Sequence, residues 1–180
     1  DSISLAEDRI KFHDLMLEIS EPVPPALQTY DFQECKEFAN KLGFPVILRS
    51  CYSLAGKGSG FARNAGELQE VFERCSSNSS NKAVYIEKSL EGLCEIELEV
   101  VRDAKGNCII VCSMENLDAM GVHTGESIVV SPIQTLSNQQ YQMLRTAAIK
   151  VVNALDVKGA CNIQFAFDYP TSKYYIIEVN

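Results

Sequence analysis

Hydrophobic positions recur with two different periods along the chain, and the changes of period mark the predicted elements. Apolar residues at helical spacing predict helices over residues 8–19, 31–42, 64–75 and 137–155. Short or alternating apolar runs predict strands over residues 45–49, 61–63, 83–87, 94–102, 108–113, 161–167 and 174–180. Prolines predict an extended linker over residues 22–25. The sum is an α+β fold with mainly antiparallel sheet.

Polar residues and glycines place the element boundaries. Asn64 with Glu67, and Ser137 with Gln140, have the spacing of a capping box at a helix start. Gly43 is the expected stop of the second helix. Residues 115–127 are polar and punctuated by glycine, which predicts a long loop, and such loops are often functional.

Composition restricts the class of protein. A length of 180 residues fits one domain, with room for two small lobes. The net charge of −8 and the scattered basic residues exclude a nucleic-acid surface, and the apolar runs are too short for a membrane span. Seven cysteines without a C-x-x-C pair fit neither a disulfide framework nor a zinc site, which indicates a reducing compartment such as the cytoplasm.

A glycine-rich segment, residues 54–60, lies between two predicted strands. Gly56, Gly58 and Gly60 would let backbone N–H groups approach an anion, although Lys57 is followed by glycine and the segment is therefore no Walker loop. Arg49 ends the strand before the loop and could pair with a phosphate there. The alternatives are a flexible hairpin tip and a surface salt bridge.

Two polar residues interrupt the last two apolar strands. Gln164 and Glu178 stand where burial would be costly without a partner. By strand parity Asn162 shares a face with Gln164, and Asn180 shares one with Glu178, so adjacent strands would direct several oxygen ligands to one place. Such hard oxygen donors suit Mg²⁺. The alternative is the solvent-facing side of an edge hairpin.

Taken together, these segments resemble the ATP-grasp unit of carbamoyl-phosphate synthetase large chains, over residues 4–180. The segments that carry the resemblance are residues 6–9, 43–49, 54–60, 99–103, 114–127, 162–166 and 177–180. Residues 107–118 with His123 look like the first, carboxyphosphate-forming unit of those enzymes. The resemblance implies two small α+β lobes with the nucleotide between them: an N-terminal helix over about residues 1–20, a glycine-loop lobe over about 21–88 and a metal and substrate lobe over about 89–180.

The resemblance also implies roles for individual residues. Phosphate binding would fall to Arg9, Arg49, Gly56, Gly58 and Gly60. Adenosine binding would fall to Glu87, Lys88, Leu90 and Glu95. Other residues that would bind ATP are Gly121, Val122, His123, Gln164 and Glu178. Divalent Mg²⁺ or Mn²⁺ would be held by Gln164, Glu178 and Asn180, and K⁺ would lie near Glu95, Asn116 and Ser127. Within this set, Arg49, Glu178 and Asn180 would be catalytic.

The implied activity is that of an ATP-dependent ligase, which phosphorylates bicarbonate on the way to carbamoyl phosphate, a pyrimidine and arginine precursor. A glutaminase subunit or domain and a second ATP-grasp half would be its partners, in the cytoplasm or alternatively in mitochondria. The chain stops before the family's Arg- and Ser-rich segment, so we expect the isolated chain to turn over little. The alternatives are a non-catalytic nucleotide-binding or interaction module, favoured by Ala55, and a biotin carboxylase, disfavoured by residues 115–127.

Overall fold

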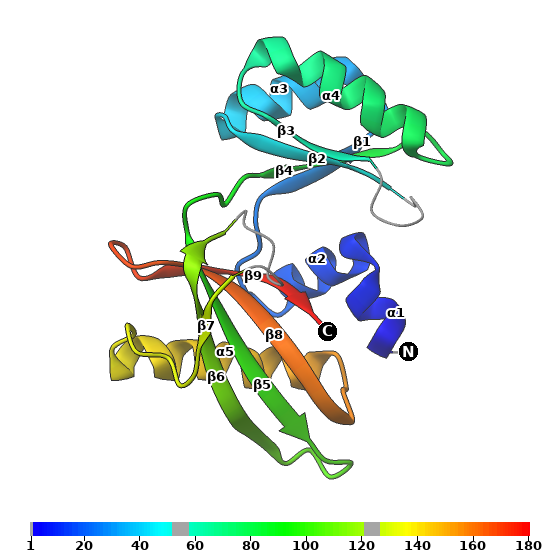
Figure 1. Cartoon of the computed structure of the whole chain (residues 1–180). Coiled ribbons are helices and arrows are strands. Elements are labelled where there is room, and N and C mark those ends of the chain that lie inside the picture. The colour runs from blue at the N-terminus through cyan, green and yellow to red at the C-terminus, as the bar shows by residue number, and fades with distance from the viewer. Residues whose placement is uncertain (1, 52–57, 121–126) are drawn as a thin grey trace. The chain divides into compact units, whose positions relative to one another are not determined.

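The computed structural model describes residues 2–51, 58–120 and 127–180, and its elements form two compact units (Figure 1). We call Pro24–Ser89 the glycine-loop unit, because residues 54–60 lie within its bounds. Asp1–Val23 together with Leu90–Asn180 form the second unit, which we call the carboxylate unit. Each unit has its own sheet and its own hydrophobic core.

The glycine-loop unit is a four-stranded antiparallel sheet with two helices. Its strands lie in the order β1 (Ala26–Thr29), β4 (Val84–Lys88), β2 (Val46–Ser50) and β3 (Ser59–Ala62). Helices α3 (Phe32–Leu42) and α4 (Ala65–Asn78) supply the rest of the core, in which residues such as Leu48, Leu68 and Ile86 are fully buried. The predicted arrangement of strand, glycine loop and strand is confirmed by the pairing of β2 with β3.

The predicted helix boundaries at Gly43 and Ser137 are confirmed. Gly43 caps α3 with a φ of +79°, a conformation that favours glycine. Ser137 and Gln140 make a full capping box at the start of α5 (Asn138–Ala154). Asn64 caps α4, but the Glu67 carboxylate accepts the backbone N–H of Arg63 and the Asn64 side-chain amide, so the reciprocal bond differs from a standard box.

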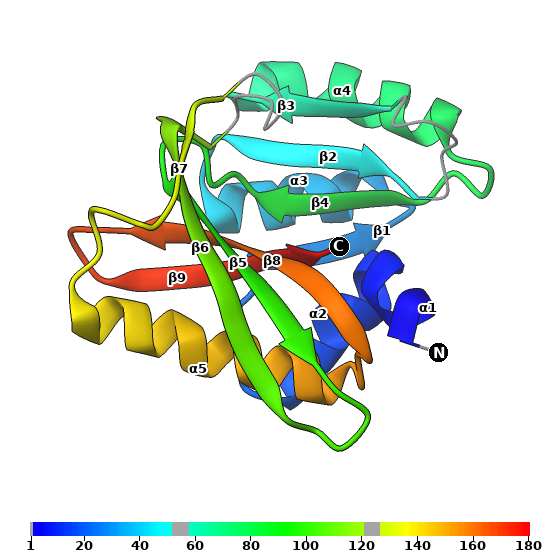
Figure 2. The same ribbon diagram turned by 60° about the horizontal axis from the view of Figure 1, so that its bottom comes forward.

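The carboxylate unit is a five-stranded antiparallel sheet, visible with its long α5 in Figure 2. Its strands lie in the order β7 (Val129–Val130), β6 (Cys108–Ala119), β5 (Cys94–Arg102), β8 (Gly159–Asp168) and β9 (Lys173–Val179). The predicted antiparallel pairing of the last two strands is confirmed. Two N-terminal helices, α1 (Ser2–Glu7) and α2 (Arg9–Glu18), also belong to this unit, and Asp8 caps α2.

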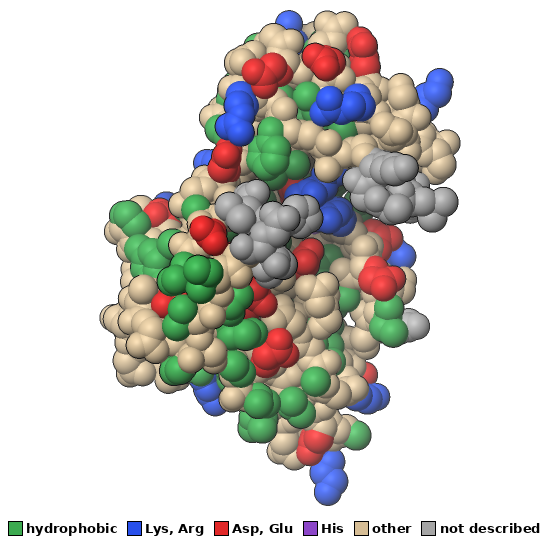
Figure 3. All heavy atoms as spheres, in the orientation of Figure 1, with side chains coloured by type: hydrophobic (Ala, Val, Ile, Leu, Met, Phe, Trp, Pro, Cys, Tyr) green, Lys and Arg blue, Asp and Glu red, His purple; other side chains and the backbone are tan. Residues whose placement is uncertain are grey.

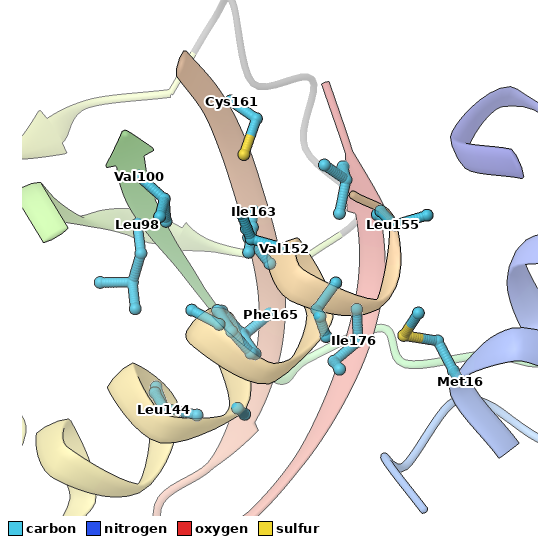
Figure 4. Close-up of a cluster of buried hydrophobic side chains, with 14 of the residues drawn as sticks. Met16, Leu98, Val100, Leu144, Val152, Leu155, Cys161, Ile163, Phe165 and Ile176 are labelled. Carbon is cyan, nitrogen blue, oxygen red and sulfur yellow. The ribbon is translucent and has the colours of Figure 1, made fainter. Parts of the chain in front are cut away.

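One face of this sheet is apolar and packs against α5 (Figure 4). Ile96, Leu98 and Val100 alternate along β5 and are fully buried. They lie in one cluster with Leu144 and Val152 of α5. The same cluster includes Ile163 and Phe165 of β8, Ile176 of β9 and Met16 of α2. This apolar face decides which side chains of β5, β8 and β9 point the other way.

The prediction of a loop over residues 115–127 is wrong for its first part, since β6 continues to Ala119 and pairs with β7 through Glu115 and Asn116. Both side chains are buried despite their polarity. Glu115 accepts hydrogen bonds from the Gln134 backbone N–H and the Thr135 hydroxyl, so burial leaves its carboxylate satisfied. Polar residues with tertiary partners do not show the apolar period from which strands are predicted.

The sequence also failed to predict helix α1 and strand β1, and it placed the end of helix α4 too early. Helix α1 precedes the predicted first helix, and β1 lies directly after the proline segment that predicts only a linker. Helix α4 runs to Asn78, beyond the predicted end at residue 75, because its last turn is built from polar residues without a stop signal. In each case the local sequence is short or polar, and contacts with neighbouring elements decide the structure.

The cysteines differ in how far they are buried. None of the seven cysteines, all of which are described, forms a disulfide, and burial raises the pKa of the Cys35 thiol to about 12 and that of the Cys75 thiol to about 11. Among the described residues, no helix is both long enough and apolar enough to cross a membrane.

The base of the glycine hairpin gives a test of packing. Gly58 has a φ of +118°, and a Cβ there would overlap the Ser50 hydroxyl and lie 2.9 Å from Asn78 Cβ. That hydroxyl cannot move freely, because it lies 2.9 Å from the carbonyl oxygen of Gly58 and 2.7 Å from that of Cys75, and its single O–H can donate to either. Gly43 also has a positive φ, but nothing lies within 4 Å of its Cβ position.

We therefore expect Gly58→Ala to lower the free energy of unfolding more than Gly43→Ala does. Backbone strain accounts for about 1–2 kcal/mol in both variants, and overlap adds about 1–3 kcal/mol in Gly58→Ala. Urea unfolding followed by circular dichroism measures both. Equal losses would show that packing at the hairpin base does not require Gly58.

Candidate functional site

The second face of the five-stranded sheet carries a group of carboxylates and amides. Glu95, Glu97 and Glu99 lie on this face of β5, opposite the apolar residues that pack on α5. We call this side of the sheet the carboxylate face. Figure 3, in the orientation of Figure 1, shows acidic side chains among hydrophobic ones over this unit. Glu95 and Glu97 are 5% and 8% exposed, so the face is not simply a solvated one.

Strand register brings the two predicted metal ligands together. Gln164 of β8 lies opposite Glu178 of β9, and on its other side it lies opposite Glu97 of β5. Side chains directly opposite each other in antiparallel strands share a face and have Cβ atoms about 5 Å apart. The predicted convergence of Gln164 and Glu178 is therefore confirmed as geometry, while their role as ligands stays a prediction.

A second polar row lies one step along the same strands. Glu99 is opposite Asn162, and Asn162 and Asn180 exchange both backbone hydrogen bonds at 2.9 Å. The Asn180 side-chain amide donates to Glu178 Oε1 at 3.2 Å. All of the residues predicted to hold divalent metal thus lie within two adjacent rows of the carboxylate face.

Amide groups hold the glutamates of β5 in place. Asn162 Nδ2 donates to Glu97 Oε2 at 2.9 Å and to Glu99 Oε1 at 2.8 Å. Asn116 Nδ2 of β6 lies 3.5 Å from Glu97 Oε1. Within the described part of the chain, the buried Oδ1 atoms of Asn116 and Asn162 have no hydrogen-bond partner. Glu97, Glu99 and Glu178 form no ion pair there with Lys or Arg, so this face has an excess of acceptors and suits a cation.

The donor set fits magnesium better than a metal that needs a complete protein cage. Among the described residues, no three His, Cys, Asp or Glu side chains form a metal-binding group on their own. Gln164, Glu178 and Asn180 together offer one carboxylate and two amide oxygens. Mg²⁺ is usually held by one or two carboxylates and takes its remaining ligands from water and substrate phosphates. The group therefore fits Mg²⁺ as part of a complex with a phosphate ligand.

In the glycine-loop unit, Arg49 lies on β2 on the face away from the buried Val46 and Leu48. Its Nε donates to Glu87 Oε1 of β4 at 2.8 Å. The alternative of a salt bridge at Arg49 is thus observed. The sequence did not identify Glu87 as its partner, because β2 and β4 are far apart in sequence. Gly58 and Gly60 lie at the base of the hairpin, where a side chain on Gly60 would overlap the Arg74 guanidinium of α4.

Other predicted site residues are more dispersed. Arg9 is the first residue of α2 and is exposed. The boundary between the two units falls between Ser89 and Leu90, within the segment predicted to lie beside adenine. In the predicted K⁺ group, Asn116 contacts Glu97, and Ser127 Oγ contacts Asp118. Gly56, Gly121, Val122 and His123 lie outside the described residues.

Glu97 was the main omission from the predicted site. It accepts from two asparagines on different strands and links both neighbouring strands of β5. The signal that could have identified it was the alternation of Glu95, Glu97 and Glu99 along one strand, since three glutamates on one face of a central strand need partners or a cation.

Solved structures place the fold in a known class. A biotin carboxylase from Campylobacter jejuni, solved as a β,γ-ATP complex, superposes with a TM-score of 0.84 at 25% identity over 99% of this chain and 41% of that chain. D-alanyl-alanine synthetase A from Vibrio cholerae superposes with a TM-score of 0.84 at 14% identity over 99% and 56% of the two chains. The chain has the ATP-grasp fold, as predicted.

Sequence comparison identifies the family within that class. Residues 8–180 match the family described as carbamoyl-phosphate synthase L chain, ATP binding domain. The carbamoyl phosphate synthase large chain of Thermoanaerobacter pseudethanolicus is 51% identical over all 180 residues, which span 17% of its length. The N-terminal section of that large chain from Methanopyrus kandleri is 50% identical, and 32% of it is covered. This chain belongs to the carbamoyl-phosphate synthase L chain family, and the predicted resemblance is confirmed.

The double contact of Asn162 can be tested by removing its amide in two ways. Asn162→Ala removes both hydrogen bonds to Glu97 and Glu99, and we expect a loss of about 2 kcal/mol in unfolding free energy. Asn162→Asp also adds a third carboxylate, so its loss should be larger at pH 7.5 and should shrink as the pH falls towards about 4, where carboxylates protonate. Urea unfolding at several pH values measures both. Identical pH dependence in the two variants would contradict the close contact of these carboxylates.

Proposed function

We propose that this chain binds Mg²⁺-ATP and phosphorylates bicarbonate to carboxyphosphate within a carbamoyl-phosphate synthase. The first-matched curated relatives are about six times as long, since the chain spans 17% of their length, so this activity is proposed for a part of a larger enzyme. The observation that carries the proposal is the pairing of Gln164 with Glu178 across β8 and β9, with Asn180 in contact with the same carboxylate.

In this proposal the β8–β9 pair holds the divalent metal. Glu178 supplies the anionic ligand, and Gln164 and Asn180 supply neutral oxygen ligands. When bound, Mg²⁺ or Mn²⁺ neutralises charge on the β- and γ-phosphates. The hydrogen bond from the Asn180 amide to Glu178 orients the carboxylate before the ligand arrives, which lowers the entropy lost on binding.

Arginines and backbone amides would meet the phosphate oxygens. Arg49 already lies on a rigid central strand with its guanidinium held at Nε. Arg9 and the glycine segment would complete the phosphate-binding site. Glu95, with residues 87–90 and 121–123, would bind the rest of the nucleotide. A K⁺ ion near Glu95, Asn116 and Ser127 belongs to the same proposal. These roles come from the family resemblance, and the described geometry supports Arg49 most directly.

The chemical step is a phosphoryl transfer. A bicarbonate oxygen forms a bond to the γ-phosphorus, the bond from that phosphorus to the β–γ bridging oxygen breaks, and ADP leaves with that electron pair. No proton has to move and no covalent protein intermediate is needed, so alignment of two anions and neutralisation of their charge account for the catalysis. Ammonia from a glutaminase subunit or domain, and a second ATP-grasp half, would complete carbamoyl phosphate synthesis in the cytoplasm.

The proposal predicts a strong effect of Glu178→Gln, which keeps the size of the side chain but removes the anionic ligand. In the complete enzyme that contains this chain, bicarbonate-dependent ADP release should fall about 100-fold or more, with weaker Mn²⁺ dependence. A coupled ADP assay at varied Mn²⁺ measures both effects.

Glu70→Gln is the matched control, because Glu70 is an exposed residue of α4. It should leave ADP release unchanged. Equal rates in wild type, Glu178→Gln and Glu70→Gln would end the catalytic assignment and would favour the alternative of a non-catalytic nucleotide-binding module.

A further inference from the structure

Arg49 and Glu87 form an ion pair on the face of the four-stranded sheet that lies away from its core. Arg49 Nε and Glu87 Oε1 are 2.8 Å apart, and the Glu87 side chain is 13% exposed against 34% for Arg49. Both residues lie on the central strands β2 and β4, where Arg49 is opposite Tyr85 and Glu87 is opposite Ile47. The Glu87 carboxylate is therefore mostly shielded from water, while the Arg49 guanidinium stays partly accessible.

The contact with Glu87 uses the Nε of Arg49 and does not involve its two Nη groups. A guanidinium has five N–H donors in a planar fork, and this contact uses the single donor on Nε. Among the described residues, no other group hydrogen-bonds to the Arg49 side chain. The two Nη groups, which bind two oxygens of one anion in parallel, are thus left for a ligand.

The negative charge of Glu87 does not by itself favour phosphate binding at Arg49. A carboxylate beside a phosphate-binding arginine repels the phosphate, so electrostatics alone would select against it. A hydrogen bond at Nε instead fixes the plane of the guanidinium, whose long side chain otherwise loses much rotamer freedom on binding.

We propose that Glu87 is a positioning residue that acts through Arg49, turning the two Nη groups towards a phosphate of the nucleotide. This inference rests on the proposed function, in which Arg49 binds ATP phosphates. The proposed role differs from the role in adenosine binding that the family resemblance implies for Glu87. Two consequences follow: Glu87 matters only when Arg49 is present, and a neutral acceptor in its place preserves the effect.

A double-mutant cycle in the complete enzyme tests this, with the KM for ATP and kcat measured in the presence of bicarbonate. Arg49→Ala should raise the KM about 10- to 100-fold, the range for a hydrogen bond to a charged group. Glu87→Ala should raise it about 3- to 10-fold, and the double variant should be no worse than Arg49→Ala alone. Glu87→Gln, which keeps an oxygen acceptor for Nε, should stay within about threefold of wild type.

The outcomes separate this inference from the function on which it rests. If Arg49→Ala leaves the KM unchanged, the proposed phosphate role of Arg49 fails, and the inference fails with it. If Arg49→Ala impairs binding but Glu87→Ala does not, the inference alone is overturned. The inference is also overturned if Glu87→Ala raises the KM for ATP as much in the Arg49→Ala background as it does in wild type. It is overturned as well if Glu87→Ala changes the preference for ATP over GTP, because Glu87 would then act on the nucleotide directly.

A folding defect is distinguished by the conservative variant. Should Glu87→Ala destabilise the glycine-loop unit in thermal unfolding, the comparison moves to Glu87→Gln. A Glu87→Gln enzyme that is fully folded but has a KM raised as far as that of Arg49→Ala would contradict positioning through an Nε hydrogen bond.

Discussion

The antiparallel register of β5, β8 and β9 is the constraint on which the candidate site depends. It places Glu97, Gln164 and Glu178 side by side across three strands. A slip of one residue in any of these strands would turn its polar side chains into the core and its apolar ones out. The alternating apolar residues that pack on α5 prevent this slip, so the hydrophobic core and the site are set by the same pairing.

The carboxylate face shows how a folded chain can hold acceptors in excess without losing its structure. Asn162 satisfies one oxygen of Glu97 and one of Glu99, but its own amide oxygen, like that of Asn116, has no partner among the described residues. Each buried and unpartnered polar atom costs about 1–3 kcal/mol. The divalent metal of the proposed function would bind to Gln164, Glu178 and Asn180 on this same face, where the neighbouring acceptor oxygens favour a positive charge.

The sequence allowed most of the core elements to be predicted, because long apolar periods and capping residues report local structure. It also allowed Gln164 and Glu178 to be placed on polar faces of two adjacent strands, since parity and adjacency in a hairpin are local features. Their direct pairing depends on a register shift between Gln164 and Phe165, which local parity does not predict. The sequence did not reveal the strand at Glu115 and Asn116, because the buried Glu115 carboxylate is satisfied by partners on a later segment of the chain. The Arg49–Glu87 contact was missed for a related reason: β2 and β4 pair across a long separation in sequence, which no local pattern reports.

The most direct measurement is the position of the metal itself. Crystals of the enzyme grown with Mn²⁺ and a non-hydrolysable ATP analogue would locate Mn²⁺ by anomalous diffraction. The account predicts a peak within about 2.0–2.3 Å of a Glu178 carboxylate oxygen and of the Gln164 amide oxygen, bridged to the analogue's phosphates. A bound analogue whose Mn²⁺ lies away from both side chains would contradict it.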